Sequence, residues 1–240
     1  KTVVMFAGGY HEAMDTADGY TRDAAGYGDA VYVVDALTGA LLWRGDETGV
    51  AVDGEAVTAF ADMDYPIPSD LALLDTNGDG ATNRVYVGDT GGQVWRIDFK
   101  NANGGMAGSG ARLAHISAPD ANGDLVAADK RKFFYAPDVS LIKDFQFSDK
   151  AAAYDVLIMV SGDRSAPNSD VVHNRIYMFR DYVISGTIYN ETLLTAPADG
   201  DPEYRRFVDS LTEDDLYNAT LNTIQNEDGS LDADEVTDLR

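Results

Sequence analysis

Oxygen-bearing side chains alternate along one short acidic stretch, residues 75–83. Asp75, Asn77, Asp79 and Asn83 occupy its first, third, fifth and ninth positions, and Ala81 occupies the seventh. Alternate positions of a tightly wound loop point toward one centre, and Ca²⁺ takes about six to eight oxygen ligands in flexible geometry. We therefore predict a Ca²⁺ site that uses four side-chain oxygens and the main-chain carbonyl of Ala81.

The stretch departs from the calcium loop of EF-hand proteins in two respects. Its twelfth position is Tyr86 rather than a bidentate Glu, and its flanks, residues 70–74 and 84–88, have the composition of strands rather than helices. With two carboxylates, and water completing the shell, we expect a dissociation constant of about 10⁻⁵ to 10⁻³ M. The alternative is a metal-free turn in which Asn and Asp side chains bond their own backbone.

Other polar motifs carry weaker signals. Asn226 to Glu235 resembles part of a second EF-hand loop, but Ile224 stands at its first position, which favours an acidic helix-turn-helix. Arg44-Gly45-Asp46 is the tripeptide that integrins bind, and a tripeptide arises easily by chance. The three histidines are not at metal-ligand spacing, and we interpret them as ordinary polar residues: His11, His115 and His173.

The sequence contains no catalytic motif that we recognise. It has no nucleophile elbow and no glycine-rich phosphate loop with Lys, and the absence of Cys excludes disulfides and thiolate zinc sites. We interpret Asp163 and Arg164 as a buried ion pair, and Trp43 and Trp95 as core residues. The sequence therefore predicts a domain without enzymatic activity.

Short strands separated by Gly and Asp turns must position the acidic loop. Two hairpins, residues 31–44 and 85–96, resemble each other, and Tyr32 and Tyr86 are separated by about one propeller blade, roughly 50 residues. This repeat predicts a mainly β fold, part of a modified β-propeller with antiparallel blades, over residues 1–185.

Two regions of the sequence lack the strand pattern. Residues 101–130 are rich in Gly, Ala, Asn and Asp and are expected to form a long loop. Residues 186–240 are expected to be irregular, with a short helical acidic segment that begins at a capping box of Ser210 and Glu213.

The charge restricts the class of partner. With 41 acidic and 18 basic residues the net charge is −23, which disfavours nucleic acid as a partner. No apolar stretch is long enough to span a membrane as a helix. The chain opens on Lys1 and a strand-like run, which suggests a segment of a longer protein.

Four segments together resemble the PilY family of type IV pilus biogenesis and pilus-tip proteins. The first, residues 85–98, follows the acidic loop directly and includes the second hairpin. The others are residues 131–139 (basic, then doubly aromatic, then Pro-Asp), residues 160–167 with Gly162-Asp163-Arg164, and residues 174–181. Their order and spacing are similar to those of the family over residues 1–185.

The resemblance implies a calcium-binding propeller module of an exported protein. It places the protein at the cell surface, pilus tip, outer membrane or periplasm, with minor pilins and a host or abiotic surface as partners. It implies roles in pilus extension, twitching motility and adhesion, with Ca²⁺ bound by Asp75, Asn77, Asp79, Ala81 and Asn83. Many members carry Asp where Asn83 stands, which would weaken binding here. The alternative is a periplasmic quinoprotein dehydrogenase, also a propeller that holds calcium.

Overall fold

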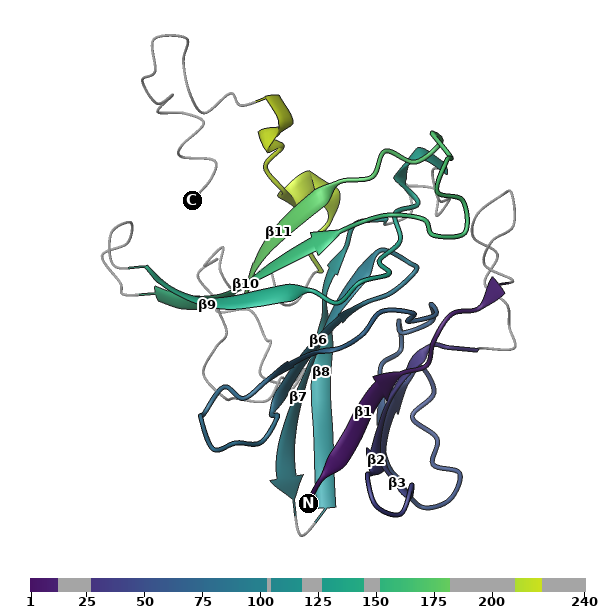
Figure 1. The fold of residues 1–240 in the computed structure, drawn as a ribbon, viewed down its shortest axis with the longest axis vertical. Coiled ribbons are helices and arrows are strands. Elements are labelled where there is room, and N and C mark those ends of the chain that lie inside the picture. Colours follow the sequence, from purple (N-terminus) through teal and green to yellow (C-terminus); the bar gives the residue numbers. More distant parts are fainter. Residues whose placement is uncertain (13–26, 103–104, 118–126, 145–151, 182–209, 222–240) are drawn as a thin grey trace, which may run out of the picture.

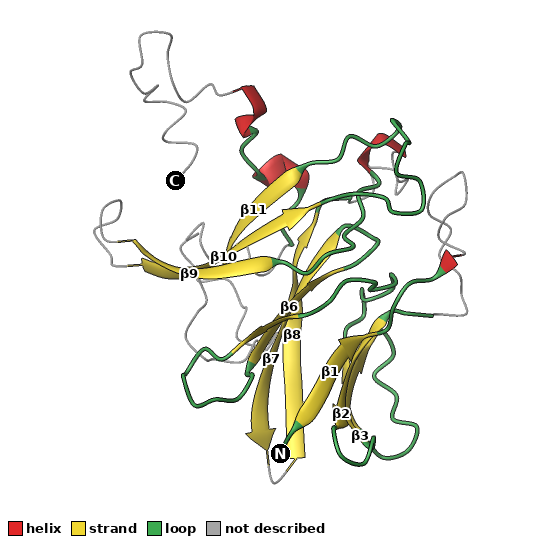
Figure 2. Ribbon diagram, viewed as in Figure 1, coloured by secondary structure: helices red, strands yellow, loops and turns green. Residues whose placement is uncertain are grey.

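Strands dominate the computed structural model, which describes residues 1–12, 27–102, 105–117, 127–144, 152–181 and 210–221 (Figures 1 and 2). They form three sheets, with the orders β1-β2-β3-β4, β5-β6-β7-β8 and β11-β10-β9. Among the described strands every pairing is antiparallel except that of β3 with β4. The prediction of a mainly antiparallel β fold is confirmed.

The strands have the following bounds in chain order: β1 Val3–Ala7, β2 Ala30–Asp35, β3 Leu41–Asp46, β4 Ala56–Ala59, β5 Ala72–Leu74, β6 Arg84–Gly88, β7 Gln93–Ala102, β8 Gly105–His115, β9 Asp138–Asp144, β10 Ala152–Val160 and β11 Ile176–Asp181.

The two similar hairpins occupy equivalent places in the first two sheets. Tyr32 of β2 lies opposite Arg44 of β3, and Tyr86 of β6 lies opposite Arg96 of β7. In both sheets the hairpin supplies the second and third of four strands. The sequence repeat is therefore the repeat of a four-stranded sheet. A closed propeller is not seen among the described residues, which form three successive sheets (Figure 1).

An aspartate closes the turn of each hairpin. Oδ1 of Asp35 accepts the N–H groups two and three residues later, at 2.8 and 3.1 Å. Oδ1 of Asp89 accepts those of Gly91 and Gln93, at 2.8 and 2.9 Å. The environments differ, because a hydrogen bond from Lys1 and the turn amides lower the pKa of Asp35 to about 2, whereas burial raises the pKa of Asp89 to about 8. The turn chemistry is thus shared, and the ion pair with Lys1, at 2.8 Å, keeps Asp35 ionised although both aspartates are buried.

Two apolar clusters hold the three sheets together, one on each face of the second sheet. In β6, Val85 and Val87 belong to the cluster shared with the first sheet, and Tyr86 belongs to the cluster shared with the third. This alternation follows from the period of two in a strand. Trp43 and Trp95 lie in the first cluster, 0% and 3% exposed, which confirms them as core residues. The second sheet is therefore the middle layer of the described structure.

The prediction of a loop over residues 101–130 is wrong for its first part. β7 runs to Ala102, and β8 pairs with it from Gly105 to His115. Glycines make this strand possible, because a Cβ on Gly108 would lie 2.6 Å from the ring of Trp43. The Gly108 carbonyl also accepts a hydrogen bond from the hydroxyl of Thr58, at 2.6 Å. The small residues that indicate a loop in the sequence allow the first sheet to approach β8 closely.

The third sheet presents an apolar outer face. Ile158 and Val160 of β10 lie opposite Met178 and Ile176 of β11, and all four side chains are 46–74% exposed. Their neighbours in sequence, Leu157 and Met159 among them, point inward and are buried. Both faces of this sheet are therefore apolar.

The acidic C-terminal part departs from the predicted helix. Its described residues contain two 3₁₀ turns, η4 (Glu213–Asp215) and η5 (Ala219–Leu221). The first turn is capped by Thr212, whose N–H and hydroxyl both donate to Asp215, at 2.8 and 2.9 Å. The predicted capping box of Ser210 and Glu213 is wrong, because the box forms between Thr212 and Asp215. The carboxylate of Glu213 is bound instead by Arg131 and Arg175. Within the described part of the chain, no helix is long and apolar enough to cross a membrane.

Candidate metal centre

The acidic loop connects β5 to β6, and its base is fixed by the sheet. Asn83 N–H donates to the carbonyl of Leu74, at 2.9 Å, and its own carbonyl accepts the N–H of Phe99 in β7, at 2.8 Å. Leu74 itself lies opposite Arg84 in the ladder. The flanks are strands, as predicted, so Asp75 and Asn83 leave adjacent strands at the same point.

Asp75 is the centre of the hydrogen bonds in the loop. Its Oδ1 accepts the N–H groups of Gly78 and Asp79, at 2.7 and 3.3 Å, and its Oδ2 accepts that of Gly80, at 2.7 Å. The hydrogen bond from Gly80 and those from the other loop amides lower the pKa of Asp75. The carboxylate is therefore ionised at neutral pH. Oδ1 already accepts two N–H groups with its two lone pairs, whereas Oδ2 accepts one and keeps a lone pair for a metal.

Three of the remaining predicted ligands also form contacts inside the loop. Nδ2 of Asn77 donates to Oδ2 of Asp79, at 3.0 Å, and Oδ1 of Asp79 accepts the N–H of Ala81, at 2.8 Å. Oδ1 of Asn83 accepts the N–H of Thr76, at 2.9 Å, which turns this side chain back over the start of the loop. The structure thus brings Asn77 and Asp79 together. Ala81 takes part in these contacts through its N–H.

Two glycines permit the winding of the loop. Gly78 and Gly80 have φ values of 75° and 86°, in the left-handed region that side chains disfavour. A Cβ at either position would meet no atom within 4 Å. Backbone conformation, and not lack of space, requires glycine here.

The donor set fits a hard cation better than a transition metal. It consists of two carboxylates, two carboxamide oxygens and one carbonyl, all oxygen ligands of the kind that Ca²⁺ takes. Within the described residues, no group of three or more His, Cys, Asp or Glu side chains gathers closely enough to hold a metal. The oxygen of the Asn77 amide accepts the N–H of Asp79, at 3.2 Å, while its NH₂ group donates to the Asp79 carboxylate.

A buried ion network begins one residue after the loop, and sequence reasoning missed it. Arg84, 1% exposed, donates from Nε to Asp98 of β7 and from Nη1 to Asp155 of β10, both at 2.8 Å. Arg84 therefore joins the end of the loop to both the second and the third sheet. The signal in the sequence was a charged residue at the start of an otherwise apolar strand.

The same network continues across β7 and β11. Arg96 donates to Asp98 and to Asp181, each at 2.8 Å. Oη of Tyr86 lies 2.7 Å from Oδ2 of Asp181 and 2.9 Å from Oδ2 of Asp155. Burial raises the pKa of Tyr86, so its phenol keeps its proton. The second and third sheets are therefore joined by charges as well as by apolar contacts.

The Arg44-Gly45-Asp46 tripeptide is not an exposed loop. All three residues lie in β3, between β2 and β4, and a Cβ on Gly45 would lie 2.5 Å from the ring of Trp43. Nε of Arg44 pairs with Asp46 at 2.8 Å, so the two charged side chains of the tripeptide bind each other. The sheet therefore holds these side chains in a conformation that differs from the extended loop that a receptor for this tripeptide binds.

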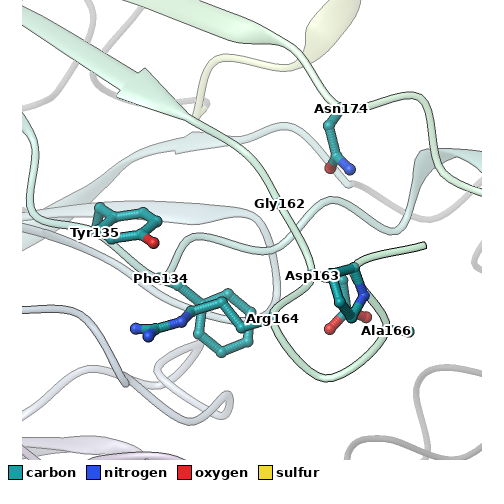
Figure 3. A pocket seen from close by; sticks show the side chains of 8 residues that line it. Phe134, Tyr135, Gly162, Asp163, Arg164, Ala166 and Asn174 are labelled. Carbon is teal, nitrogen blue, oxygen red and sulfur yellow. The ribbon is translucent and has the colours of Figure 1, made fainter. Parts of the chain in front are cut away.

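The predicted ion pair of Asp163 with Arg164 is wrong. Asp163 pairs with Lys132, at 2.9 Å, and Arg164 lies over the ring of Tyr135, 5.5 Å from its centroid. Asp163, Arg164 and Tyr135 line a pocket of about 260 Å³, to which Phe134 and Asn174 also contribute (Figure 3). The local cause is the turn at residues 163–165, where Asp163 accepts the N–H of Ser165 at 2.9 Å.

The other candidate motifs divide between described and undescribed residues. His115 is buried, and burial lowers its pKa to about 4. The ring of His11 lies against that of Tyr27, with centroids 5.3 Å apart. The second EF-hand-like stretch, Asn226 to Glu235, lies outside the described residues.

Comparison with solved structures gives a structural likeness, and the other two comparisons, with family models and with curated proteins, give no match. The crystal structure of the Pseudomonas aeruginosa PilY1 C-terminal domain is similar, with a TM-score of 0.45 and 21% identity, over 78% of this chain and 35% of that chain. The present chain thus spans about a third of that structure. A likeness of this size assigns no function to it.

Proposed function

We propose that residues 75–83 bind Ca²⁺, in a β module of an exported type IV pilus protein. The observation that carries the calcium site is the loop itself: oxygen donors at alternate positions, two glycines at positive φ, and a base fixed between β5 and β6. In this proposal the ligands are Asp75, Asn77, Asp79, the carbonyl of Ala81 and Asn83. Water completes the shell.

Calcium in this loop would act on the sheet and not on a substrate. The ion would join the ends of β5 and β6, where the ladder of three residue pairs is short. It would also offset the negative charge of Asp75 and Asp79. The role is that of a structural clamp, and we propose that the module is not an enzyme.

The pilus assignment rests on the four sequence segments that are similar to the PilY family. They support a part in pilus extension, twitching motility and surface adhesion, with minor pilins as partners. Reduction of a dye by the protein, reconstituted with quinone and supplied with an alcohol or sugar, would instead support the quinoprotein alternative.

Calorimetric titration with Ca²⁺ tests the site. We expect the wild-type chain to bind one ion with a dissociation constant of about 10⁻⁵ to 10⁻³ M, and Asp75→Asn to lose measurable binding. Asp70→Asn is the matched control, because Asp70 is exposed, carries the same charge and lies outside the loop. Equal binding by Asp75→Asn and wild type would refute the site.

Thermal unfolding gives an independent measurement. Because the ion binds the folded loop, Ca²⁺ at 100 times its dissociation constant should add about 2.7 kcal/mol to the free energy of unfolding. We expect Tm to rise with Ca²⁺ in wild type and in Asp70→Asn. The same rise in Asp75→Asn would place the effect outside the loop.

A further inference from the structure

A short piece of the acidic C-terminal part lies along β8 as a docked peptide would. We call residues 210–215 the acidic segment. The N–H of His115 donates to the carbonyl of Leu211, at 2.7 Å, and the N–H of Leu211 donates to the carbonyl of Leu113, at 3.0 Å. These bonds make a parallel bridge between Leu211 and Ala114. Addition of an extended peptide to the edge of a sheet is a common mode of peptide recognition.

One apolar side chain anchors the segment. Leu211 is 6% exposed and belongs to the cluster between the second and third sheets, together with Leu113 and Tyr177. Next to it, Nε of Arg112 donates to the hydroxyl of Ser210, at 2.8 Å. The segment therefore contributes one core residue and one polar contact beside it.

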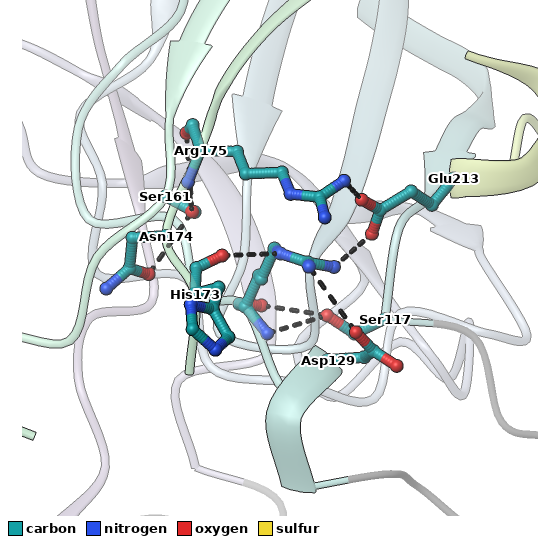
Figure 4. A network of polar contacts seen from close by, with 8 residues as sticks. Ser117, Asp129, Ser161, His173, Asn174, Arg175 and Glu213 are labelled. Atoms are coloured by element: carbon teal, nitrogen blue, oxygen red, sulfur yellow. Dashed lines mark hydrogen bonds and ion pairs between the residues drawn. The ribbon is translucent and has the colours of Figure 1, made fainter. Parts of the chain in front are cut away.

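Two arginines hold the carboxylate of Glu213. Nη1 of Arg131 contacts one oxygen and Nη1 of Arg175 contacts the other (Figure 4). The acidic segment thus presents Leu and Glu two positions apart to an apolar site and a basic site.

The rest of the protein positions Arg131 for this contact. Its Nε donates to the carbonyl of His173, at 3.1 Å, and its Nη2 contacts Asp129, at 3.3 Å. Its backbone N–H donates to the hydroxyl of Ser117, at 2.9 Å. The side chain is 2% exposed, and a buried charge requires a partner. The guanidinium is therefore fixed by the protein body, with Nη1 directed at the segment.

A buried polar group beside the arginines is not used by the segment. Tyr177 is 5% exposed, and its hydroxyl has no hydrogen-bond partner within the described structure. Arg131, Glu213 and Arg175 all act electrostatically on this hydroxyl, which places it in the same cluster. The site thus offers a polar group beyond those that its present occupant engages.

The charge of the site is opposite to that of the protein. The chain carries −23 overall, yet Arg112, Arg131 and Arg175 face one short segment whose last three residues are all acidic. The connection from β11 to this segment comprises residues 182–209 of the sequence. A segment on the same chain competes with free peptide, because its own binding is intramolecular.

We propose that β8, Arg131 and Arg175 form a recognition site for an extended acidic peptide with Leu two positions before Glu. The acidic segment is its intramolecular ligand, and the same segment of a second copy of this chain can take its place. The main-chain bonds to β8 provide affinity, and the Leu and Glu contacts provide specificity.

Fluorescence anisotropy with the full chain tests the proposal. The probe is a labelled peptide with the sequence of residues 209–216, and Leu211→Ala/Glu213→Gln frees the site of its own segment. We expect the freed chain to bind the peptide at least about tenfold more tightly than wild type, because the wild-type segment competes. Peptides with Leu→Ala or Glu→Gln at the matching positions are the controls.

The proposal is overturned if the double variant has a native circular dichroism spectrum but does not bind the peptide. It is also overturned if the variant binds all three peptides equally. If the double variant does not fold, Arg175→Glu replaces it, since Arg175 is partly exposed. Because Arg131 still faces the site, this variant should bind the unchanged peptide more weakly than wild type does, and its preference over the Glu→Gln peptide should decrease. A preference as large as that of wild type would overturn the proposal as well.

Discussion

At the scale of single residues, each candidate calcium ligand already has a role without metal. Asp75 accepts three backbone N–H groups, and Asn83 accepts the N–H of Thr76. These are the contacts of the metal-free turn, and the proposed ion would add to them. The same loop residues therefore serve both the metal-free turn and the proposed calcium site. Mutants that preserve the hydrogen bonds of the turn but change a ligand test the calcium site separately.

Asn83→Asp preserves the turn and adds a carboxylate. The new side chain has the same shape and can still accept the N–H of Thr76. We expect calcium affinity to rise by about tenfold, because a third charge strengthens a hard-ion site. Asn174→Asp, which adds the same charge at an exposed position elsewhere, should leave the affinity unchanged in the same titration. A weaker site in Asn83→Asp would contradict this ligand assignment.

His115 should make stability depend on pH. Burial, reinforced by Arg112 and opposed by Asp62, lowers its folded pKa to about 4 from an unfolded value near 6.5. Between these two pKa values, His115 is protonated in the unfolded chain and neutral in the folded chain. The free energy of unfolding that depends on neutral His115 is therefore fully present above about pH 6.5 and is lost as pH falls toward 4.

The measurement is the free energy of unfolding of wild type and His115→Gln from pH 7 to pH 4. The wild type should lose more stability than the variant over this window, by a difference of about 2–3 kcal/mol. Parallel curves would show that His115 titrates equally in both states.

At the scale of elements, the contact between the second and third sheets combines an apolar cluster with buried charges. Arg84 lies at its centre, since it starts β6 and reaches Asp155 in β10. Removal of one partner from a buried ion pair leaves the other charges uncompensated. The network is therefore sensitive to single changes.

Arg84→Met should lower the free energy of unfolding by about 3–5 kcal/mol, as measured by urea denaturation. Arg164→Met is the control, because Arg164 is exposed and stacks on Tyr135. That change should cost less than about 1 kcal/mol. Similar losses in the two variants would show that the buried network contributes little.

At the scale of the whole molecule, a net charge of −23 opposes the compact state. Monovalent salt screens such repulsion, with a Debye length of about 10 Å at 0.1 M. We expect Tm to rise gradually as NaCl increases from 0.02 to about 0.5 M, equally in wild type and Asp75→Asn. A salt effect confined to wild type would instead indicate cation binding in the loop.

The second and third sheets differ in how far their faces are covered. The middle sheet is covered on both faces, whereas the third sheet leaves Ile158, Val160, Ile176 and Met178 exposed on its outer face. Mainly antiparallel sheets with a repeated hairpin confirm the mainly β fold of the prediction. Closure into a propeller stays a prediction.

The sequence by itself determined the features with local causes. Alternating apolar residues and aspartate turns marked the hairpins of β2–β3 and β6–β7, and the Asp, Asn and Gly pattern marked the acidic loop and its strand flanks. Each depends on residues a few positions apart, so the pattern is visible in the chain. The calcium site itself stays a prediction.

The tertiary structure alone decided the features that depend on distant partners. Gly108 lies in a strand because Trp43 packs on it, Arg84 is buried because Asp155 meets it, and Glu213 leaves its predicted cap because Arg131 and Arg175 bind it. In each case the energy comes from a group far away in the chain. Local conformational propensities do not include that energy, because packing and charge pairing between sheets form only in the folded structure. These features could therefore not be predicted from neighbouring residues.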